Sequence, residues 1–335
     1  MKMLSWNTTN QCNMFCDHCY REAGSKLSDE LTTDQARKMI DDIKKAGFKL
    51  MIFSGGEPLM RPDIYELGHY ATEQGLRAVM GSNGSLITPE VAERLKESGF
   101  MAAGISLDSL NPAKNNAFRK LENAFELTVQ GMKNLQAAGL PFQIHTTVMD
   151  WNVHELEAIC DFAVELGAMA YHVFFLVPTG RGVEIEAEAL RVKEYEQTIA
   201  RLMEKQKKIP IEIKPTCAPQ FMRVADKKGL SLRFSRGCLA GISYCIISPK
   251  GDVQACAYLN MPLGNVKEKP FDKIWLESPV LKELRTLDYK GKCGLCDYKQ
   301  KCGGCRARAY YYRDGDYMAQ DDWCLYQPPG VKCHE

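Results

Sequence analysis

Long apolar runs, an excess of charge of one sign and an amino-terminal export signal are all missing from this sequence. No apolar stretch approaches the roughly 18 residues that span a membrane, and residues 1–13 lack the apolar core of a signal peptide. The 43 lysines and arginines balance the 42 aspartates and glutamates to a net charge of +1. We therefore expect a cytoplasmic protein, with no membrane partner and no nucleic-acid partner.

Cysteine is abundant, yet it is nearly absent from the middle of the chain. Of the 14 cysteines, three lie between residues 12 and 19 and nine between residues 238 and 333, with only Cys160 and Cys217 elsewhere. In a reducing compartment, clustered thiols are metal ligands more often than disulfides. The length of 335 residues, of which 45% are hydrophobic, suits one large domain with a smaller second one.

Short apolar runs alternate with amphipathic stretches over the first half of the chain. A helix is expected after Thr32, with apolar residues at helical spacing and Gly47 as its stop. Such strand–helix units predict an α/β fold with a parallel sheet, curved into a partial (β/α)6 barrel of the TIM type. Its active site would lie at the carboxyl ends of the strands. The six strands are expected at residues 3–8, 49–53, 76–80, 102–107, 142–148 and 171–177.

The second half of the chain divides into two parts. Residues 187–208 predict a long charged helix, and residues 209–236 show no clear periodicity. From Gly237 onward, short strand patterns mix with cysteine, glycine and aromatic residues, so inorganic clusters would have to hold this segment together. The expected regions are a barrel core, a bridging helix with a linker, and a cysteine-rich domain, at residues 1–186, 187–236 and 237–335.

Cys12, Cys16 and Cys19 follow the first expected strand in the spacing CxxxCxxC, with Tyr20 directly after them. Three thiolates cannot complete a closed four-ligand site. On a cubane iron–sulfur cluster, which takes four thiolates, they would leave one iron open for a substrate or cosubstrate. A zinc loop completed by His18 or by a distant cysteine is the alternative.

Polar residues follow the next strands, at the same rim of the expected barrel. Gly55, Gly56 and Glu57 follow the second strand, where glycines allow a ligand to approach the backbone and Glu57 could pair with an amino group. A plain Gly-Pro turn is the alternative at this point. The later strand ends carry further polar side chains: Ser82 and Asn83, then Ser106 and Asp108, with Arg119 downstream.

In this order, the motifs strongly resemble the radical S-adenosylmethionine (radical SAM) superfamily, over roughly residues 3–180. The resemblance implies a catalytic [4Fe–4S] cluster on the three clustered cysteines, with S-adenosylmethionine on the open iron. It implies that the methionine amino group is held by the Gly-Gly-Glu turn and that Tyr20 lies by the adenine. The other strand-end polar residues, Ser82, Asn83, Ser106, Asp108 and Arg119, would complete the cofactor site. Reduction by one electron would give a 5′-deoxyadenosyl radical that abstracts hydrogen from a substrate.

The carboxyl-terminal cysteines are similar to the SPASM extension of that superfamily, which binds auxiliary [4Fe–4S] clusters. The pattern departs from the motif in one place, because Cys302 and Cys305 enclose two residues where the motif has three. The resemblance implies two clusters, one on Cys238, Cys245, Cys256 and Cys305 and one on Cys293, Cys296, Cys302 and Cys324. A zinc ribbon is the alternative. Of the remaining thiols, Cys160 is expected in a helix core and Cys333 in the tail, and Cys217 has no assignment.

Members with this extension modify either peptides and protein side chains or tetrapyrroles. Residues 5–13, 178–182, 214–221, 236–241 and 292–309 resemble tetrapyrrole-modifying members. Because Cys12 lies near the start of the chain, we expect no leader-peptide module before it. The expected reaction removes acetate side chains from 12,18-didecarboxysiroheme to give Fe-coproporphyrin III. The alternatives are propionate removal toward heme d1, oxidative decarboxylation of Fe-coproporphyrin III to heme, and peptide modification; a non-enzymatic electron carrier is disfavoured.

A tetrapyrrole carries several carboxylates, so its site needs local cations. Arg181, at the end of the sixth expected strand, is predicted to bind substrate through two charge-assisted hydrogen bonds. Lys214, Arg223, Arg233 and Arg236 are further candidates. A low-potential electron donor such as ferredoxin or flavodoxin is expected as a partner, and the protein is expected to be a monomer.

Overall fold

The computed structural model describes residues 1–329, and Cys333 lies outside them. Within these residues a single nine-stranded sheet runs in the order β7-β6-β5-β4-β3-β2-β1-β8-β9. Every neighbouring pair is parallel except β8 and β9. The strands are β1 (Met3–Asn7), β2 (Leu50–Ser54), β3 (Arg77–Ser82), β4 (Ala103–Ser106), β5 (Phe142–Val148), β6 (Ala170–Phe175), β7 (Glu212–Thr216), β8 (Tyr244–Ile247) and β9 (Val253–Gln254).

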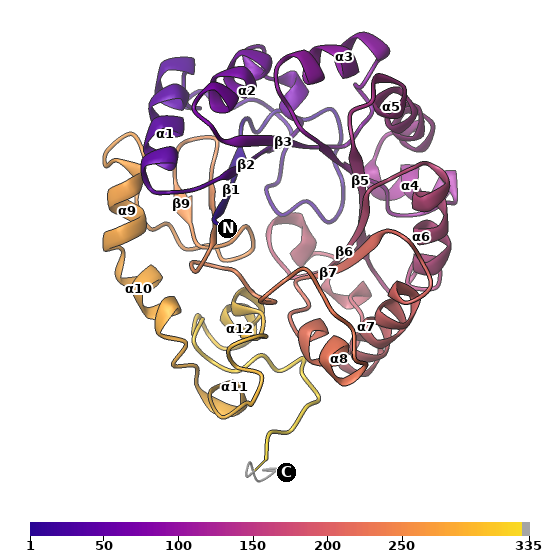
Figure 1. Ribbon diagram of the computed structural model, residues 1–335, viewed down its shortest axis with the longest axis vertical. Coiled ribbons are helices and arrows are strands. Elements are labelled where there is room, and N and C mark those ends of the chain that lie inside the picture. The colour runs from indigo at the N-terminus through magenta and orange to yellow at the C-terminus, as the bar shows by residue number, and fades with distance from the viewer. Residues whose placement is uncertain (330–335) are drawn as a thin grey trace.

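The sheet curves into an arc with the helices on its outer side (Figure 1). The barrel helices are α1 (Thr33–Lys45), α2 (Ile64–Glu73), α3 (Pro89–Glu97), α4 (Pro112–Arg119), α5 (Ala124–Ala138), α6 (Leu156–Glu165), α7 (Val192–Gln206) and α8 (Phe221–Lys227). The later part of the chain adds α9 (Phe271–Glu277), α10 (Pro279–Thr286), α11 (Gly291–Gly294) and α12 (Arg306–Tyr312). None of the helices within residues 1–329 combines the length and the apolar character that crossing a membrane requires.

Local sequence signals explain the first helix of the barrel. The Thr32 side chain accepts a hydrogen bond from Gln35 N while the Gln35 side chain accepts from Thr32 N, which is a complete capping box. The predicted apolar stripe of Ala36, Met39, Ile40 and Ile43 is buried, and Gly47 follows with a φ of 79°. Two helices, α4 and α5, connect β4 to β5.

The six predicted strands are all present, and the sheet extends beyond them at both edges. One edge carries β7, which lies in residues 209–236, where no strand was predicted. Its five residues include Lys214 and Pro215, so its apolar signal is weak, and proline is tolerated because β7 is an edge strand. At the other side β8 pairs in parallel with β1. The cysteine-rich region therefore continues the barrel sheet.

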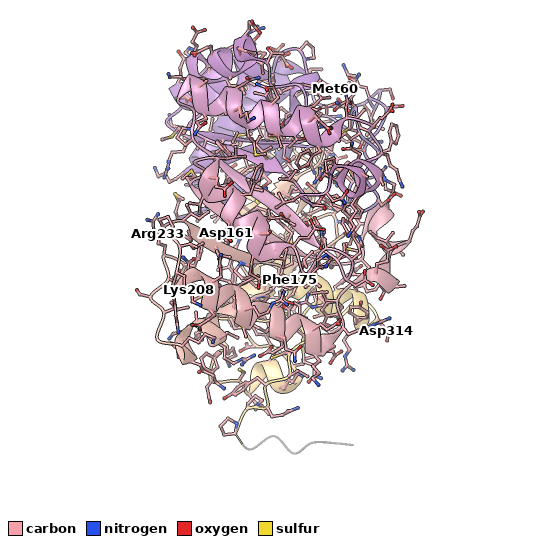
Figure 2. All side chains as sticks on the ribbon, turned by 90° about the vertical axis from the view of Figure 1, so that its right-hand side faces the viewer. Met60, Asp161, Phe175, Lys208, Arg233 and Asp314 are labelled. Atoms are coloured by element: carbon pink, nitrogen blue, oxygen red, sulfur yellow. The ribbon has the colours of Figure 1, made fainter. Side chains whose placement is uncertain are left out.

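The two faces of the sheet differ in burial, and this difference places side chains relative to the barrel interior. On β5 the buried residues alternate with partly exposed ones such as His145; β6 and β7 alternate in the same way, with His172 and Lys214 partly exposed. The buried face packs under the helices, where Phe175 lies well inside the molecule (Figure 2). His145, His172 and Lys214 are in register with one another, so they share the inner face.

A buried ion pair joins the cysteine-rich region to the barrel helices. Arg308 of α12 and Asp321 are both fully buried, with Nε and Oδ1 2.9 Å apart. Arg308 also donates to the hydroxyl of Tyr195 on α7, and Asp321 accepts from Gln220, just before α8. Burial alone would raise the pKa of Asp321, but Arg308 outweighs that effect and lowers the pKa to about 2.

Replacing Asp321 with alanine should destabilise the protein strongly, because Arg308 would remain buried without its counter-ion. Loss of one partner of a buried pair costs about 3–5 kcal/mol. The matched control is Asp322→Ala, because Asp322 forms a partly exposed pair with Arg313, and such pairs contribute at most about 1 kcal/mol. Anaerobic thermal unfolding measures both variants. Equal shifts of the two midpoints would contradict the structural role of Asp321.

Candidate active site and cluster sites

The loop after β1 carries Cys12, Cys16 and Cys19 across the inside of the arc (Figure 1). Its backbone is held by hydrogen bonds from Cys12 N to Gly24 O, 2.9 Å, and from Cys19 N to Cys16 O, 3.2 Å. The charges of Cys16 and Cys19 act on the Cys12 thiol, so the three cysteines lie in one region of the loop. Their role as cluster ligands stays a prediction.

The surroundings of the three thiols suit metal-bound thiolates. Met14 N donates to Cys12 Sγ at 3.4 Å, and Ala23 N donates to Cys19 Sγ at 3.5 Å. Arg119 Nη1 lies 3.9 Å from Cys16 Sγ. Burial raises the pKa of Cys12 to about 12 and also raises that of Cys16, so bound metal is what would keep these thiols ionised. Donors aimed at the sulfurs fit an iron–sulfur cluster, whose potential they tune.

Among residues 1–329, no three side chains of cysteine, histidine, aspartate or glutamate, the loop cysteines included, converge closely enough to hold one ion. His18, the candidate fourth zinc ligand, stacks on Phe118 with ring centres 4.5 Å apart. Burial lowers the pKa of His18 to about 4.

The glycine turn after β2 packs directly against the cysteine loop. Gly56 N donates to Thr9 O at 2.8 Å, and Glu57 N donates to Gln11 O at 2.7 Å. A Cβ on Gly56 would lie 2.2 Å from Gln11 O, and Gly55 has a φ of 138°. These glycines therefore let the chain's own loop approach the turn, a contact that sequence reasoning did not predict.

Glu57 is fully buried and organises the end of β3. Its carboxylate accepts hydrogen bonds from Ser82 Oγ at 3.0 Å and from Asn83 N at 2.9 Å, and burial raises its pKa to about 7. Asn83 in turn donates to Asn13 Oδ1 at 2.8 Å, which links β3 to the cysteine loop. Sequence reasoning missed Asn13, because a spacer position inside CxxxCxxC carries no signal of its own.

Asp108 and Arg119 form a buried ion pair beside the second cysteine of the loop. Arg119 Nη2 lies 2.5 Å from Asp108 Oδ2, and Asp108 Oδ1 accepts from Thr147 N at 2.8 Å. Ser106, at the end of β4, lies opposite His145 of β5. The predicted cofactor residues after β2, β3 and β4 thus gather around the loop; their individual contacts with S-adenosylmethionine stay predictions.

Several buried nitrogen atoms in and near the loop have no partner within the described residues. Arg119 Nε and Asn7 Nδ2 are two of them. The hydroxyl of Tyr20 donates to Asn7 Oδ1 at 2.9 Å, so Asn7 lies beside the predicted adenine contact. Buried donors without partners are costly, and a polar cofactor would satisfy them. The residues present therefore fit a cluster with S-adenosylmethionine beside it.

Arg181 holds the cysteine loop, a role that sequence reasoning missed. Its Nε donates to Cys16 O at 2.9 Å and its Nη1 to Ala23 O at 3.0 Å. Only Nη2 is without a partner among the described residues. This geometry corrects the expected two-bond contact with a substrate carboxylate, because two of the three guanidinium nitrogens are already bonded to the chain.

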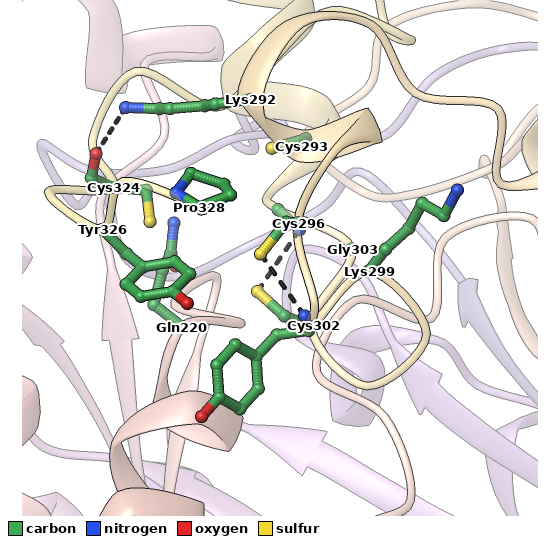
Figure 3. A pocket seen from close by; sticks show the side chains of 12 residues that line it. Gln220, Lys292, Cys293, Cys296, Lys299, Cys302, Gly303, Cys324, Tyr326 and Pro328 are labelled. Carbon is green, nitrogen blue, oxygen red and sulfur yellow. Dashed lines mark hydrogen bonds between the residues drawn. The ribbon is translucent and has the colours of Figure 1, made fainter. Parts of the chain in front are cut away.

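The thiols predicted for the second auxiliary cluster line one pocket. Cys293, Cys296, Cys302 and Cys324 surround it together with Gln220 and Tyr326 (Figure 3). Backbone N–H groups point at three of the sulfurs: Asp321 N at Cys293, Tyr298 N at Cys296 and Gly304 N at Cys302, at distances between 3.4 and 3.5 Å. Four thiols around one pocket, with donors directed at them, fit a cubane.

The set predicted for the first auxiliary cluster is only partly assembled. The thiols of Cys238, Cys256 and Cys305 are close enough for their charges to act on one another. Cys245 does not join them: it is fully buried on β8, and Arg285 is the charged group beside it. The charges of Cys305, Cys256 and Cys238 act on the thiol of Cys217, which was left unassigned from the sequence. Cys160 is buried in α6, as predicted.

Comparisons with known proteins match this architecture. A model described as the radical SAM superfamily matches residues 6–163, and the SPASM iron–sulfur cluster-binding domain matches residues 238–306. Two proteins named AdoMet-dependent heme synthase, from Methanosarcina barkeri and Nitratidesulfovibrio vulgaris, are 41% and 42% identical to this chain over 98% of its length and 97% and 93% of theirs. The chain belongs to the radical SAM superfamily.

As a radical SAM enzyme with a SPASM domain, the protein uses S-adenosylmethionine and iron–sulfur clusters, as predicted. A further relative, named Fe-coproporphyrin III synthase, from Methanosarcina barkeri, is 32% identical over 96% of this chain and 87% of its own length. The crystal structure of Streptococcus suis SuiB bound to S-adenosylmethionine superposes with a TM-score of 0.76 at 18% identity, over 97% of this chain and 77% of that one. This likeness confirms the fold.

Replacing Arg181 with methionine should impair S-adenosylmethionine cleavage itself. The substitution removes two charge-assisted hydrogen bonds to the cysteine loop, each of which contributes about 1.5–3 kcal/mol, so we expect cleavage to fall by about two orders of magnitude or more. Arg201→Met is the matched control, because Arg201 also donates to a carbonyl oxygen, that of Val153, but at the surface. Release of 5′-deoxyadenosine measures the effect. Normal cleavage by Arg181→Met, with weakened substrate binding, would restore the substrate role.

Proposed function

We propose that this enzyme forms heme from Fe-coproporphyrin III by oxidative decarboxylation of propionate side chains to vinyl groups. The observation that carries the proposal is the 39–42% identity to proteins named AdoMet-dependent heme synthase, over nearly the full length of this chain. The relative named Fe-coproporphyrin III synthase is less similar, at 32%. The heme-forming reaction is therefore favoured over the acetate removal that the sequence analysis placed first.

The bound cofactors would supply a 5′-deoxyadenosyl radical and sites that take up single electrons. A propionate becomes a vinyl group when it gives up one hydrogen atom from the carbon attached to the macrocycle, then carbon dioxide and one electron. The reaction thus needs a one-electron acceptor as well as the low-potential donor. The ferredoxin or flavodoxin donor, the cytoplasmic location and the monomeric state remain predictions.

The inner face of β5, β6 and β7 offers chemistry that suits an iron tetrapyrrole. The rings of His145 and His172 are stacked 5.1 Å apart. Burial lowers the pKa of His145 to about 4 and that of His172 well below its usual value, so both rings are neutral at physiological pH. His145 Nε2 has no partner within residues 1–329. A neutral imidazole is a ligand that porphyrin iron accepts.

Lys214, beside His172 on the same face, is the best placed cation for a substrate carboxylate. Within the described residues it forms no ion pair, and burial lowers its pKa; its ammonium lies 4.5 Å from the ring centre of Phe234. The other candidate cations already bond to groups of the chain or lie at the exposed edge of the molecule. Arg223 pairs with Glu196, Arg236 donates to the hydroxyl of Tyr289, and Arg233 is 87% exposed at the edge of the molecule (Figure 2).

A parallel assay of two tetrapyrroles tests the proposed reaction. The reconstituted enzyme is incubated anaerobically with S-adenosylmethionine and a low-potential reductant, together with either Fe-coproporphyrin III or 12,18-didecarboxysiroheme. Mass spectrometry should detect heme from the first and no product from the second. Formation of Fe-coproporphyrin III from 12,18-didecarboxysiroheme would instead favour acetate removal, and turnover of neither would favour a peptide substrate.

Replacing Lys214 with methionine should raise the Kd for Fe-coproporphyrin III on the order of tenfold, because a charge-assisted hydrogen bond contributes about 1.5–3 kcal/mol. Lys208→Met, at an exposed position after α7, is the control and should bind as the unmodified protein does. A titration followed by visible absorption measures both constants. Equal constants for the two variants would remove Lys214 from the substrate site.

A further inference from the structure

Cys245 is turned away from the other thiols of the first auxiliary set. The neighbouring Tyr244 faces the site, since its hydroxyl donates to Ser5 at 3.1 Å and the charges of Cys256 and Tyr20 act on it. Successive side chains of a strand point to opposite faces of the sheet, so Cys245 points outward. There it is 0% exposed within the apolar core, and a cluster could reach its sulfur only by opening that core.

Cys217, unlike Cys245, lies at the end of the sheet that faces the first auxiliary set. It directly follows β7 at the carboxyl end of the sheet and keeps part of its surface exposed. Two residues later, Pro219 packs so tightly against Gly237 that a Cβ there would lie 2.7 Å away. Because Gly237 directly precedes Cys238, this contact brings the Cys217 turn beside the first SPASM cysteine.

The other ligands approach the same turn. Burial raises the pKa of the Cys217 thiol, and so would the charges of Cys305, Cys256 and Cys238, in that order. Hydrogen bonds through Asp321 also connect the Cys217 turn to Cys305. Gln220, three residues after Cys217, donates to Asp321 Oδ2 at 2.8 Å. The same oxygen accepts from Cys305 N, also at 2.8 Å.

The backbone of Cys217 also departs from ordinary geometry. Its φ is +58°, in the left-handed region that a residue with a side chain enters only at an energetic cost. Such conformations persist where the surroundings impose them, and they are common at functional sites. Here the left-handed turn lies between the end of β7 and the Pro219 contact, where the chain leaves the sheet beside Cys238.

We infer that Cys217, and not Cys245, completes the first auxiliary cluster together with Cys238, Cys256 and Cys305. Four thiolates satisfy a [4Fe–4S] cluster. The inference rests on the proposed SPASM clusters but not on the identity of the tetrapyrrole. Because Cys217 belongs to the barrel and precedes the matched SPASM residues 238–306, this cluster would tie the two parts of the protein together.

Iron content distinguishes the two cysteines. The unmodified protein, reconstituted anaerobically, should hold about 12 irons, four for each of three cubanes. Cys217→Ala should lose between about one and about four irons, while Cys245→Ala keeps about 12. Retention of all iron by Cys217→Ala, or loss of iron by Cys245→Ala, would overturn the inference. Neither count involves a tetrapyrrole, so a failure of heme formation by the unmodified enzyme leaves this test intact.

A pair of serine variants covers the case in which an alanine variant does not fold. Cys217→Ser keeps the size of the side chain and would place an oxygen on one iron, which gives a new iron site in the Mössbauer spectrum. Cys245→Ser should leave that spectrum unchanged. A new site in Cys245→Ser and none in Cys217→Ser would overturn the inference.

Discussion

The buried ion pair between Arg308 and Asp321 is the interaction on which the cysteine-rich half of the molecule depends. Both side chains are completely buried, and further hydrogen bonds offset part of the cost of burying such a pair. The partners of Asp321 supply them and bring in the thiols: Cys305 N and Gln220 donate to its carboxylate, and its own N–H donates to Cys293 Sγ. One aspartate, through its carboxylate and its backbone N–H, therefore positions residues of both predicted auxiliary sets against the barrel.

Arginine performs a comparable task at the catalytic loop. Arg119 pairs with Asp108 while facing Cys16, and Arg181 donates to two carbonyl oxygens of the loop. A guanidinium can form several hydrogen bonds in a fixed geometry and never loses its charge, so it can hold a loop that carries negatively charged ligands. The predicted catalytic thiols are thus held by residues of the segments that follow β4 and β6 rather than by a core of their own.

Much of this arrangement could be predicted from the sequence, because its signals are local. The six central strands, the capping box of the first helix and the motifs at the strand ends each lie within a few consecutive residues. The features that were missed depend on distant contacts. The strand at residues 212–216 is short and contains Pro215, and the pairing of β8 with β1 joins residues about 240 positions apart. The outward direction of Cys245 follows from that pairing, and no spacing rule could show it.

The most direct test of the proposed reaction follows a hydrogen atom from substrate to cofactor. Fe-coproporphyrin III is deuterated at the propionate carbon attached to the macrocycle and incubated with the enzyme, S-adenosylmethionine and a reductant. The 5′-deoxyadenosine formed alongside heme should carry deuterium. Heme formation accompanied only by unlabelled 5′-deoxyadenosine would contradict the proposed reaction, because the radical would then have attacked another position.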